Sequence, residues 1–351
     1  MDPSRPDTTV VVCTYEGERH VAQQIASILW QTERPARIIV ADDGSTDRTL
    51  TRARTAFEQN RGDELGVEFT VVKRPNPSGG VAKNVEFALG EVTTPYVALA
   101  DQDDVWLPNR LQLTHAALAD GAVLAATDAL PTDAELMPVG PRLWELMGAG
   151  GASAELDGSQ RTLRLLARGN IFPGMTMTMR TEFARSCLPV PAGWIHDFWL
   201  VLNAALARRL AIVAAPTVLY RQHDQNQIGS PEPTEQRGSR ARHPLRTLRR
   251  GLELARDGVP RPALSYDIWS DEAWSAECFA RLRERATVTA DLALLEGAVA
   301  FQRDLRTLPL SARQRLPIVL RHLFNGDYRA FHSDPLNVLK LDLVAGVQQR
   351  P

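Results

Sequence analysis

The sequence predicts an α/β protein with an open, mainly parallel sheet, helices on both faces of that sheet, and a helical extension at the C-terminus. Three observations lead to this fold class. Short β-branched apolar runs alternate with segments of helical spacing, acidic residues follow several of these runs, and residues 263–351 are rich in Leu, Ala and Arg. Strands that alternate with helices form parallel sheets through right-handed crossovers.

The first hundred residues carry the alternation. The run TTVVVCTY (8–15) ends in polar residues, as a buried parallel strand does. A helix is expected within residues 16–32, because its apolar residues fall near one face; they are Val21, Ile25, Ile28 and Leu29. The next strand and turn are expected in 36–47, where Gly44 permits a turn and Ser45 or Asp47 caps the following helix. A strand in 67–75, a helix in 79–90 and a strand in 96–104 complete the series.

The pattern changes beyond residue 133. Residues 169–183 alternate in β-prone residues and lead into a helix, 189–209 form a proline-bounded turn and a helix that opens at His196, and 210–223 form another strand. Residues 226–262 are dominated by Pro, Gly, Ser, Gln and Arg, which is typical of a linker or a lid. The chain is therefore expected to consist of a domain at 1–225, this linker, and a helical region at 263–351.

Composition describes an ordinary globular protein. Of the 351 residues, 44% are hydrophobic and 23% are charged, and the formal net charge is −2. A chain without net positive charge has no global field to recruit nucleic acid, so no nucleic-acid partner is expected. Three distant cysteines, Cys13, Cys187 and Cys278, give neither a disulfide framework nor a zinc pattern.

A cytoplasmic location is expected. The first residues lack the basic start and apolar run of a signal peptide. The most apolar long segment, 200–220, is interrupted by Asn203, Arg208 and Arg209, so it is not expected to cross a membrane.

Polar residues gather where the expected strands end. In open α/β sheets, ligands bind outside the carboxyl ends of the strands; the residues expected there are Thr14, Asp42, Asp43, Asp101 and Asp103. The segment LADQDDVWLP (99–108) places three carboxylates in four positions, and such crowding calls for a cation or hydrogen-bond donors. The simpler alternative is a solvated acidic turn between a strand and a helix.

The acidic pairs suit a nucleoside diphosphate. Asp-x-Asp after a buried strand presents alternate side chains on the same side, and Mg²⁺ takes one or two carboxylates while phosphate oxygens fill its other positions. Asp42 and Asp43 could accept hydrogen bonds from a base or a ribose. Neither GxGxxG after the first strand nor GxxxxGK[ST] occurs, which excludes dinucleotide oxidoreductases and P-loop NTPases.

Seven ordered motifs resemble those of glycosyltransferase family 2, most closely its bacterial rhamnosyltransferase-type branch. They are VVCTYEGERHVAQQIASILWQT, IIVADDGSTDRT, GGVAKNVEFAL, LADQDDVWLPNRLQ, GMTM, WIHDFWL and VLYRQHDQNQIG. The resemblance covers about residues 8–230. It implies a GT-A fold, with a nucleotide-sugar half at about 1–105 and an acceptor half at about 106–225.

The resemblance also implies an activity. The enzyme would be an inverting, metal-dependent glycosyltransferase that uses Mg²⁺ or Mn²⁺ and moves a sugar from a nucleoside diphosphate to a cell-surface glycan or a polyprenyl-linked acceptor. The best donor is rhamnose from dTDP-rhamnose, and a UDP-hexose or UDP-galactofuranose is the alternative. Two other classes stay open, a metal-dependent phosphohydrolase and a silent nucleotide-sugar-binding module.

Individual roles follow from the matching motifs. Asp43, with Asp42, would hold the pyrimidine and ribose, helped by the backbone around Thr14 and Tyr15. Glu16 stands where relatives often have Asn and adds a charge beside that site. Further nucleotide-sugar contacts are implied for Lys83, Asp101, Gln102 and Asp104. The metal ligands would be Asp103 and His223, the general base Asp197, and the acceptor-side residues Trp194, His196 and Trp199.

Two surfaces outside the motifs could bind partners. Residues 237–250 carry six arginines with Leu245 and Leu248 among them, which favours either a solvated linker or peripheral contact with an anionic membrane at the inner face of the cell membrane. The C-terminal helices could pair two chains as a homodimer or cover the acceptor groove.

Overall fold

The structure, a computed structural model, describes residues 7–74, 80–149, 160–223, 273–309 and 311–331, together with 336, 339, 342 and 343. The chain divides into two compact units. The first comprises Met1–Thr162, Asn170–Val190 and Trp194–Pro231, and the second comprises Leu163–Gly169, Pro191–Gly193 and Glu232–Pro351. The expected linker at 226–262 and the basic stretch at 237–250 lie outside the described residues.

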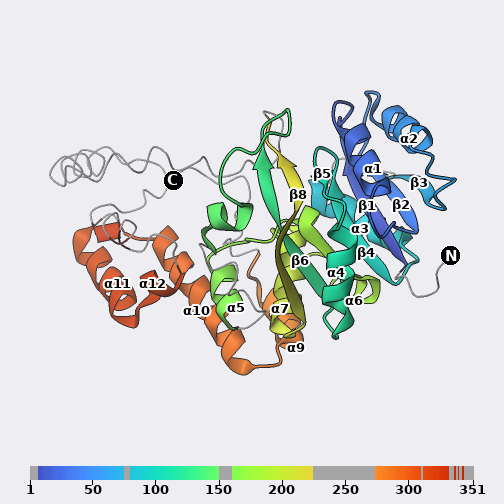
Figure 1. The fold of residues 1–351 in the computed structure, drawn as a ribbon. Helices are drawn as coiled ribbons and strands as arrows, with labels where there is room; N and C mark the ends of the chain where they lie inside the picture. The colour runs from blue at the N-terminus through green and yellow to red at the C-terminus, as the bar shows by residue number, and fades with distance from the viewer. Residues whose placement is uncertain are drawn as a thin grey trace. The chain divides into compact units, whose positions relative to one another are not determined.

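The first unit is built on one eight-stranded sheet with the order β3-β2-β1-β4-β7-β6-β8-β5 (Figure 1). Strands β1 to β4 pair in parallel, β7 runs antiparallel between β4 and β6, β8 is parallel to β6, and β5 is antiparallel to β8. The strands are β1 (Thr8–Thr14), β2 (Arg37–Asp42), β3 (Glu68–Lys73), β4 (Tyr96–Asp101), β5 (Val105–Trp106), β6 (Leu124–Thr132), β7 (Met177–Arg180) and β8 (Leu210–Arg221). The predicted α/β class, with a mixed and mainly parallel sheet, is confirmed.

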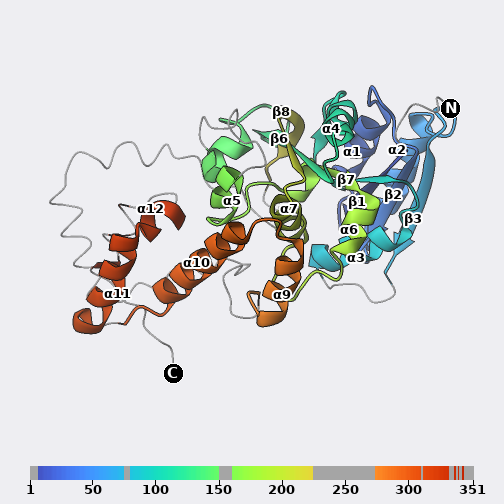
Figure 2. The same ribbon diagram turned by 90° about the horizontal axis from the view of Figure 1, so that it is seen from below.

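Helices cover both faces of this sheet. One face carries α1, α2 and α4, and the other carries α3 and α6 (Figure 2). The helices of this part of the chain are α1 (Val21–Leu29), α2 (Thr49–Gln59), α3 (Gly80–Glu91), α4 (Arg110–Ala119), α5 (Gln160–Leu166), α6 (Thr181–Ser186) and α7 (His196–Leu206). The predicted order of strands and helices over residues 8–104 is confirmed.

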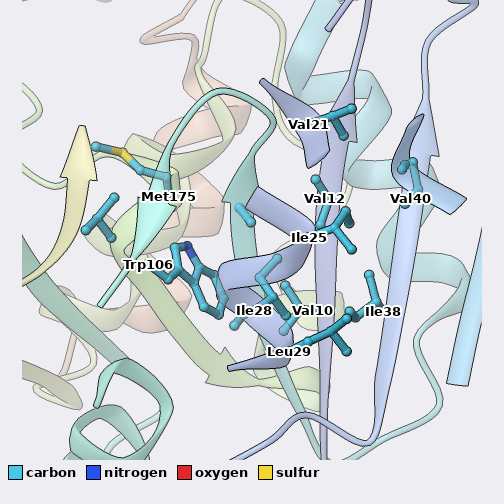
Figure 3. Close-up of a cluster of buried hydrophobic side chains, with 14 of the residues drawn as sticks. Val10, Val12, Val21, Ile25, Ile28, Leu29, Ile38, Val40, Trp106 and Met175 are labelled. Carbon is cyan, nitrogen blue, oxygen red and sulfur yellow. The ribbon is translucent and has the colours of Figure 1, made fainter. Parts of the chain in front are cut away.

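The core between the sheet and its first helix is made by the residues that the periodicity selected. Val21, Ile25, Ile28 and Leu29 of α1 are at most 1% exposed. They pack against alternate residues of β1 and β2 and against Trp106, as Figure 3 shows. Burial of each such side chain stabilises the fold by roughly 1.5–3 kcal/mol. The packing of α1 thereby holds the carboxyl ends of β1 and β2 in place.

A buried arginine joins the parallel strands to the antiparallel one. The Nη2 of Arg110 donates to the carbonyls of Leu99 in β4 and Met177 in β7, at 3.2 and 3.1 Å. Its guanidinium lies 4.1 Å from the ring centroid of Trp106 and is fully buried. Burial lowers the pKa of Arg110 to about 9, and nearby Asp104 and Asp101 oppose that shift.

The second unit is helical, as predicted for the C-terminal region. Its helices are α9 (Ala276–Arg285), α10 (Thr289–Arg306), α11 (Ala312–Asn325) and α12 (Asp327–Phe331). The ring of buried His322 bonds Asp327 through Nδ1 at 2.7 Å and Asp304 through Nε2 at 2.9 Å, so one imidazole connects α10, α11 and the start of α12. Among the helices that the structure describes, none combines the length and the apolar character needed to span a membrane.

Candidate active site

The carboxyl ends of three adjacent strands bring the predicted acidic residues to one edge of the sheet. Thr14 on β1 is the register partner of Asp42 on β2, and Cys13 is the partner of Asp101 on β4. The loops that follow these strands therefore begin side by side. The convergence rests on parallel pairing, which places equivalent strand ends at one edge.

Asp42 organises its own loop. Its side chain is 1% exposed, and both carboxylate oxygens accept hydrogen bonds. The donors are the Thr14 hydroxyl at 3.0 Å, the Ser45 hydroxyl at 2.6 Å, and the amides of Gly44 and Ser45 at 3.2 and 3.0 Å. The neighbouring Asp43 pairs with Arg74 at 3.3 Å and keeps 12% of its side chain exposed. Asp43 is thus the better placed of the two carboxylates to meet a nucleotide.

The β1–α1 and β2–α2 loops are hydrogen-bonded to each other in both directions. The Glu16 amide donates to the Ser45 hydroxyl at 3.0 Å, and the Glu16 carboxylate accepts from the amide and hydroxyl of Thr46 at 2.7 and 3.0 Å. The Gly17 amide donates to the Thr49 hydroxyl at 2.7 Å. The charge that Glu16 adds beside the site is therefore used to join the two loops.

Gln102 holds the residue after β1. Its Oε1 accepts from the Tyr15 amide and its Nε2 donates to the Tyr15 carbonyl, both at 2.9 Å. A Cβ on Gly17 would lie 2.0 Å from the same Oε1, so this glycine leaves room for the amide. The side chain of Tyr15 is 50% exposed. The DQDD segment thereby fixes the loop that presents Tyr15.

The acidic loop after β4 contains one accessible carboxylate and one buried one. Asp103 Oδ2 lies 3.0 Å from the Nε2 of His223, and both side chains are 16% exposed. Asp104 is fully buried; its Oδ1 accepts from the Arg221 amide at 3.1 Å, and its Oδ2 has no hydrogen-bond partner among the described residues. Arg221 also donates through Nε to the Asp103 carbonyl at 2.8 Å, so β8 is fastened to this loop.

Burial and mutual repulsion disfavour the charged forms of the carboxylates in this loop. Burial, followed by repulsion from Asp103 and Asp197, raises the pKa of Asp101 to about 7. Burial, with Asp103 and Asp101 nearby, also raises the pKa of Asp104 well above its usual range. A cation would relieve the repulsion among these carboxylates.

The donor set at this loop fits a divalent cation. In the described part of the chain, no group of three or more His, Cys, Asp or Glu side chains is arranged to hold a metal. Asp103 and His223 offer two adjacent donors, an oxygen and a nitrogen. Mg²⁺ binds the carboxylate oxygen, Mn²⁺ also accepts the imidazole nitrogen, and phosphate oxygens and water can complete either shell. The residues present therefore fit a divalent cation.

His20 belongs to the same cluster, although sequence analysis did not select it. Its ring stacks on His223 with centroids 5.0 Å apart and planes inclined by 30°. Burial lowers the pKa of His20, and the nearby Arg221 and His223 add to that shift. No spacing in the sequence connects residues 20 and 223; only the neighbouring positions of α1 and the end of β8 do.

Asp197 lies in the first turn of α7. Its side chain is 6% exposed, and its Oδ2 accepts from the Gly174 amide at 3.0 Å. It lies close enough to Asp101 to raise the pKa of that carboxyl. The adjacent His196 is 6% exposed, and burial lowers its pKa. The candidate base and the candidate metal ligands thus border one region of the first unit.

Three other predicted residues lie in different surroundings. Lys83 pairs with Glu86 at 2.9 Å along α3. Trp199 has no exposed surface, and its indole nitrogen donates to the Cys187 carbonyl at 2.8 Å. Trp194 is 5% exposed and packs edge-on against Trp199 with ring centroids 5.2 Å apart. In this structure both indoles are buried and pack against each other near the start of α7.

Comparison with known proteins matches part of this chain to a sequence family. Residues 9–165 match the family described as Glycosyl transferase family 2. An uncharacterized glycosyltransferase of Nostoc sp. is 34% identical over 104 residues, which are 30% of this chain and 30% of that protein. The dTDP-rhamnosyl transferase RfbG of Shigella flexneri is 25% identical over 237 residues, 62% of this chain and 74% of that protein. The match thus spans less than a third of the Nostoc relative and about three quarters of the Shigella one.

Comparison with solved structures gives matches with TM-scores below 0.5, among them these two. The Staphylococcus aureus protein TarS, residues 1–349, in complex with UDP-GlcNAc, superimposes with a TM-score of 0.48 at 16% identity, covering 96% of this chain and 90% of that one. The mannosyltransferase PcManGT of Pyrobaculum calidifontis, in complex with GDP-Man and Mn²⁺, gives 0.46 at 18% identity, covering 97% and 88%.

Proposed function

Residues 9–165 belong to glycosyltransferase family 2, and from this premise we propose that the protein is an inverting, metal-dependent enzyme that transfers a sugar from a nucleoside diphosphate to an acceptor hydroxyl. The observation that carries the proposal is Asp197, a buried carboxylate in the first turn of α7 whose charge raises the pKa of Asp101 at the end of β4. Inversion needs a base on the acceptor side and charge stabilisation on the leaving-group side, and these groups provide both.

The donor side would use the loops after β1, β2 and β4. Asp43 would accept hydrogen bonds from the base or ribose, and Tyr15, held by Gln102, would line the same place. Asp101 would lie by the ribose. Asp103 and His223 would hold Mg²⁺ or Mn²⁺, which when bound neutralises charge on the diphosphate.

The chemical step is a single displacement. The acceptor oxygen attacks C1 of the sugar from the face opposite the diphosphate, the bond between C1 and the phosphate oxygen breaks, and the acceptor proton passes to the Asp197 carboxylate. The hydrogen bond from the Gly174 amide fixes one oxygen of Asp197, so that its orientation is set before substrate binds. The nucleoside diphosphate leaves with the bonding electrons.

We propose rhamnose from dTDP-rhamnose as the donor, with a UDP-sugar as the alternative. The support is the motif set and the similarity to RfbG, which is named as a dTDP-rhamnosyl transferase. The acceptor would be a cell-surface glycan or a polyprenyl-linked sugar that approaches the side of His196.

Calorimetric binding of dTDP, UDP and GDP and of their sugars, with and without Mg²⁺ or Mn²⁺, tests the donor site. We expect metal-dependent binding of a pyrimidine diphosphate and its loss in Asp103→Asn. Asp63→Asn is the matched control, because Asp63 is an exposed carboxylate in the turn before β3. Binding that ignores metal, or that survives in Asp103→Asn, would contradict the proposed site.

Transfer is tested separately with a rhamnose donor and lipid-linked or glycan acceptors. Asp197→Asn should keep donor binding and lose about 10²–10⁴-fold in kcat, because it lacks only the base. Release of phosphate from the donor without any acceptor, undiminished in Asp197→Asn, would instead indicate a phosphohydrolase.

A further inference from the structure

We propose that His20 is a positioning residue of the donor site: its imidazole stacks on His223 and fixes the plane in which Nε2 of His223 faces Asp103. The inference rests on the proposed metal-dependent function. It assigns a role to His20, a residue of the first motif that received none above, and it concerns how well the ligand pair is formed before a cation binds.

The contact is a ring-on-ring stack. The centroids of His20 and His223 are 5.0 Å apart and the planes differ by 30°, within the range of favourable aromatic pairs. At the edge of its ring, His223 meets Asp103, with Nε2 3.0 Å from Oδ2. The imidazole of His223 is therefore held by a stacking contact and a polar contact made by two different segments.

The stack is supported by a second link between the same two segments. Nη2 of Arg221, two residues before His223, donates to Oε1 of Gln23 in the first turn of α1 at 2.5 Å. Arg221 also donates to the backbone of Asp103. The start of α1, the end of β8 and the acidic loop are thus joined at fixed positions, and His20 reaches His223 from a rigid base.

The imidazole of His20 does not cap the helix that it precedes. His20 is the N-cap residue of α1, but its side chain makes no capping hydrogen bond. The cap is served through its backbone carbonyl, which accepts from the amides of Gln23 and Gln24 at 2.9 and 3.4 Å. A small polar residue would cap this helix better than histidine does, so the ring is explained by what it contacts.

Preorganisation of a ligand has a measurable effect. Residues that orient a metal ligand typically change metal affinity by 10–100-fold when they are replaced. Without the stack, the ring of His223 could turn about its side-chain bonds, and binding would have to restrain it. We expect Mn²⁺ affinity to depend on an aromatic ring at position 20 rather than on a nitrogen atom there.

The experiment measures Mn²⁺ binding to the full chain by calorimetry in the presence of dTDP or UDP, for wild type, His20→Ala, His20→Phe and His223→Ala. Arg19→Ala is the matched control, since it alters the exposed neighbour on the same turn. His20→Ala should bind Mn²⁺ about tenfold more weakly, His20→Phe should stay within about threefold of wild type, and Arg19→Ala should not change. Thermal unfolding of each variant checks that the fold persists.

A second readout needs no metal. Long-range ¹H–¹⁵N spectra of the metal-free protein should show a single sharp His223 ring in wild type and in His20→Phe, and a shifted or broadened one in His20→Ala. Wild-type affinity in His20→Ala, or equal weakening in His20→Phe and His20→Ala, would overturn the positioning role. If His223→Ala bound Mn²⁺ as wild type does, the proposed metal site itself would fail, whatever the ring spectra showed.

Discussion

The side chain of Gln102 forms two hydrogen bonds with the backbone of Tyr15, one to its amide and one to its carbonyl, each 2.9 Å long. The two residues are 87 positions apart, on loops that follow adjacent strands. A primary amide is the side chain that both donates and accepts in one plane, so it matches a peptide unit.

Replacing Gln102 should therefore weaken donor binding. Gln102→Ala loses both bonds, and we expect the KM for the nucleotide sugar to rise about tenfold, since each bond contributes roughly 0.5–1.5 kcal/mol. Gln102→Glu can accept from the Tyr15 amide but cannot donate to the carbonyl while ionised. Its KM should therefore lie between those of wild type and Gln102→Ala. Steady-state kinetics separates KM from kcat; an unchanged KM in Gln102→Ala would contradict the role.

Adding one methyl group at Gly174 should disturb the catalytic side. A Cβ there would lie 2.8 Å from the Nε2 of His196 and 3.5 Å from the Cβ of Asp197. Because both side chains are buried, we expect Gly174→Ala to displace them and to lower kcat by about 10²-fold. Donor binding, measured by calorimetry, should stay close to wild type.

Gly90→Ala is the matched control for that change. A Cβ at Gly90 meets nothing within 4 Å, and the residue lies inside α3. Alanine should stabilise the helix by about 0.5–1 kcal/mol and leave kcat unchanged. Full activity in Gly174→Ala would show that the position of His196 is not critical.

Asp128 should make stability depend on pH. It is fully buried in β6; its Oδ1 accepts from the amides of Ala129 and Trp144 at 2.8 and 3.1 Å, and burial raises its pKa. The folded state therefore binds this proton more tightly than the unfolded state, whose carboxyl has a pKa of about 3.9. The stabilisation is complete below that value and is lost as the pH rises through the raised folded pKa.

Urea denaturation from pH 4 to pH 8 measures this contribution. The free energy of unfolding of wild type, relative to Asp128→Asn, should decrease as the pH rises from 4 and should level off above the raised pKa of Asp128. Asp120→Asn, at an exposed position after α4, should run parallel to wild type over the same range. Parallel curves for Asp128→Asn would mean that the buried carboxyl does not titrate differently in the folded state.

His322 should control the stability of the C-terminal helices. His322→Phe keeps the edge-on packing against Phe301, whose ring centroid is 5.1 Å away, but loses the bonds to Asp304 and Asp327. We expect hydrogen exchange in α10–α12 to report a loss of about 2 kcal/mol. Arg321→Ala removes an exposed ion pair to the same Asp304 and should cost less than about 1 kcal/mol. Equal exchange in both variants would contradict the central role of the imidazole.

Much of the first unit follows from local sequence. Strands β1, β2 and β4 are apolar runs that end in polar or acidic residues, and parallel pairing brings those ends together without further information. The face of α1 that is buried is the one selected by its period. These features depend on hydrophobic patterning, which a single sequence displays directly.

The duties of individual polar residues depend on contacts between distant segments. Asp42 and Asp43 look equivalent in the sequence. In the structure, Asp42 accepts hydrogen bonds from its own loop, whereas Asp43 pairs with Arg74. Trp194 and Trp199 are expected on the acceptor side from their motif, and the sequence does not show that they pack edge-on against each other. The stack of His20 on His223 joins positions 203 residues apart, and no periodicity encodes such a contact.

The reciprocal bonds between the first two loops limit how the proposed donor site can be redesigned. Glu16 and Gly17 depend on Ser45, Thr46 and Thr49, so a replacement of either loop alone leaves unmatched donors and acceptors on the other. Loop grafts from a transferase with a different nucleotide should therefore be made as pairs, with both segments taken from the same parent. Libraries that vary one loop alone will mostly break the hydrogen bonds between the two loops. Libraries that vary both loops together can keep these bonds while they change the nucleotide that is bound.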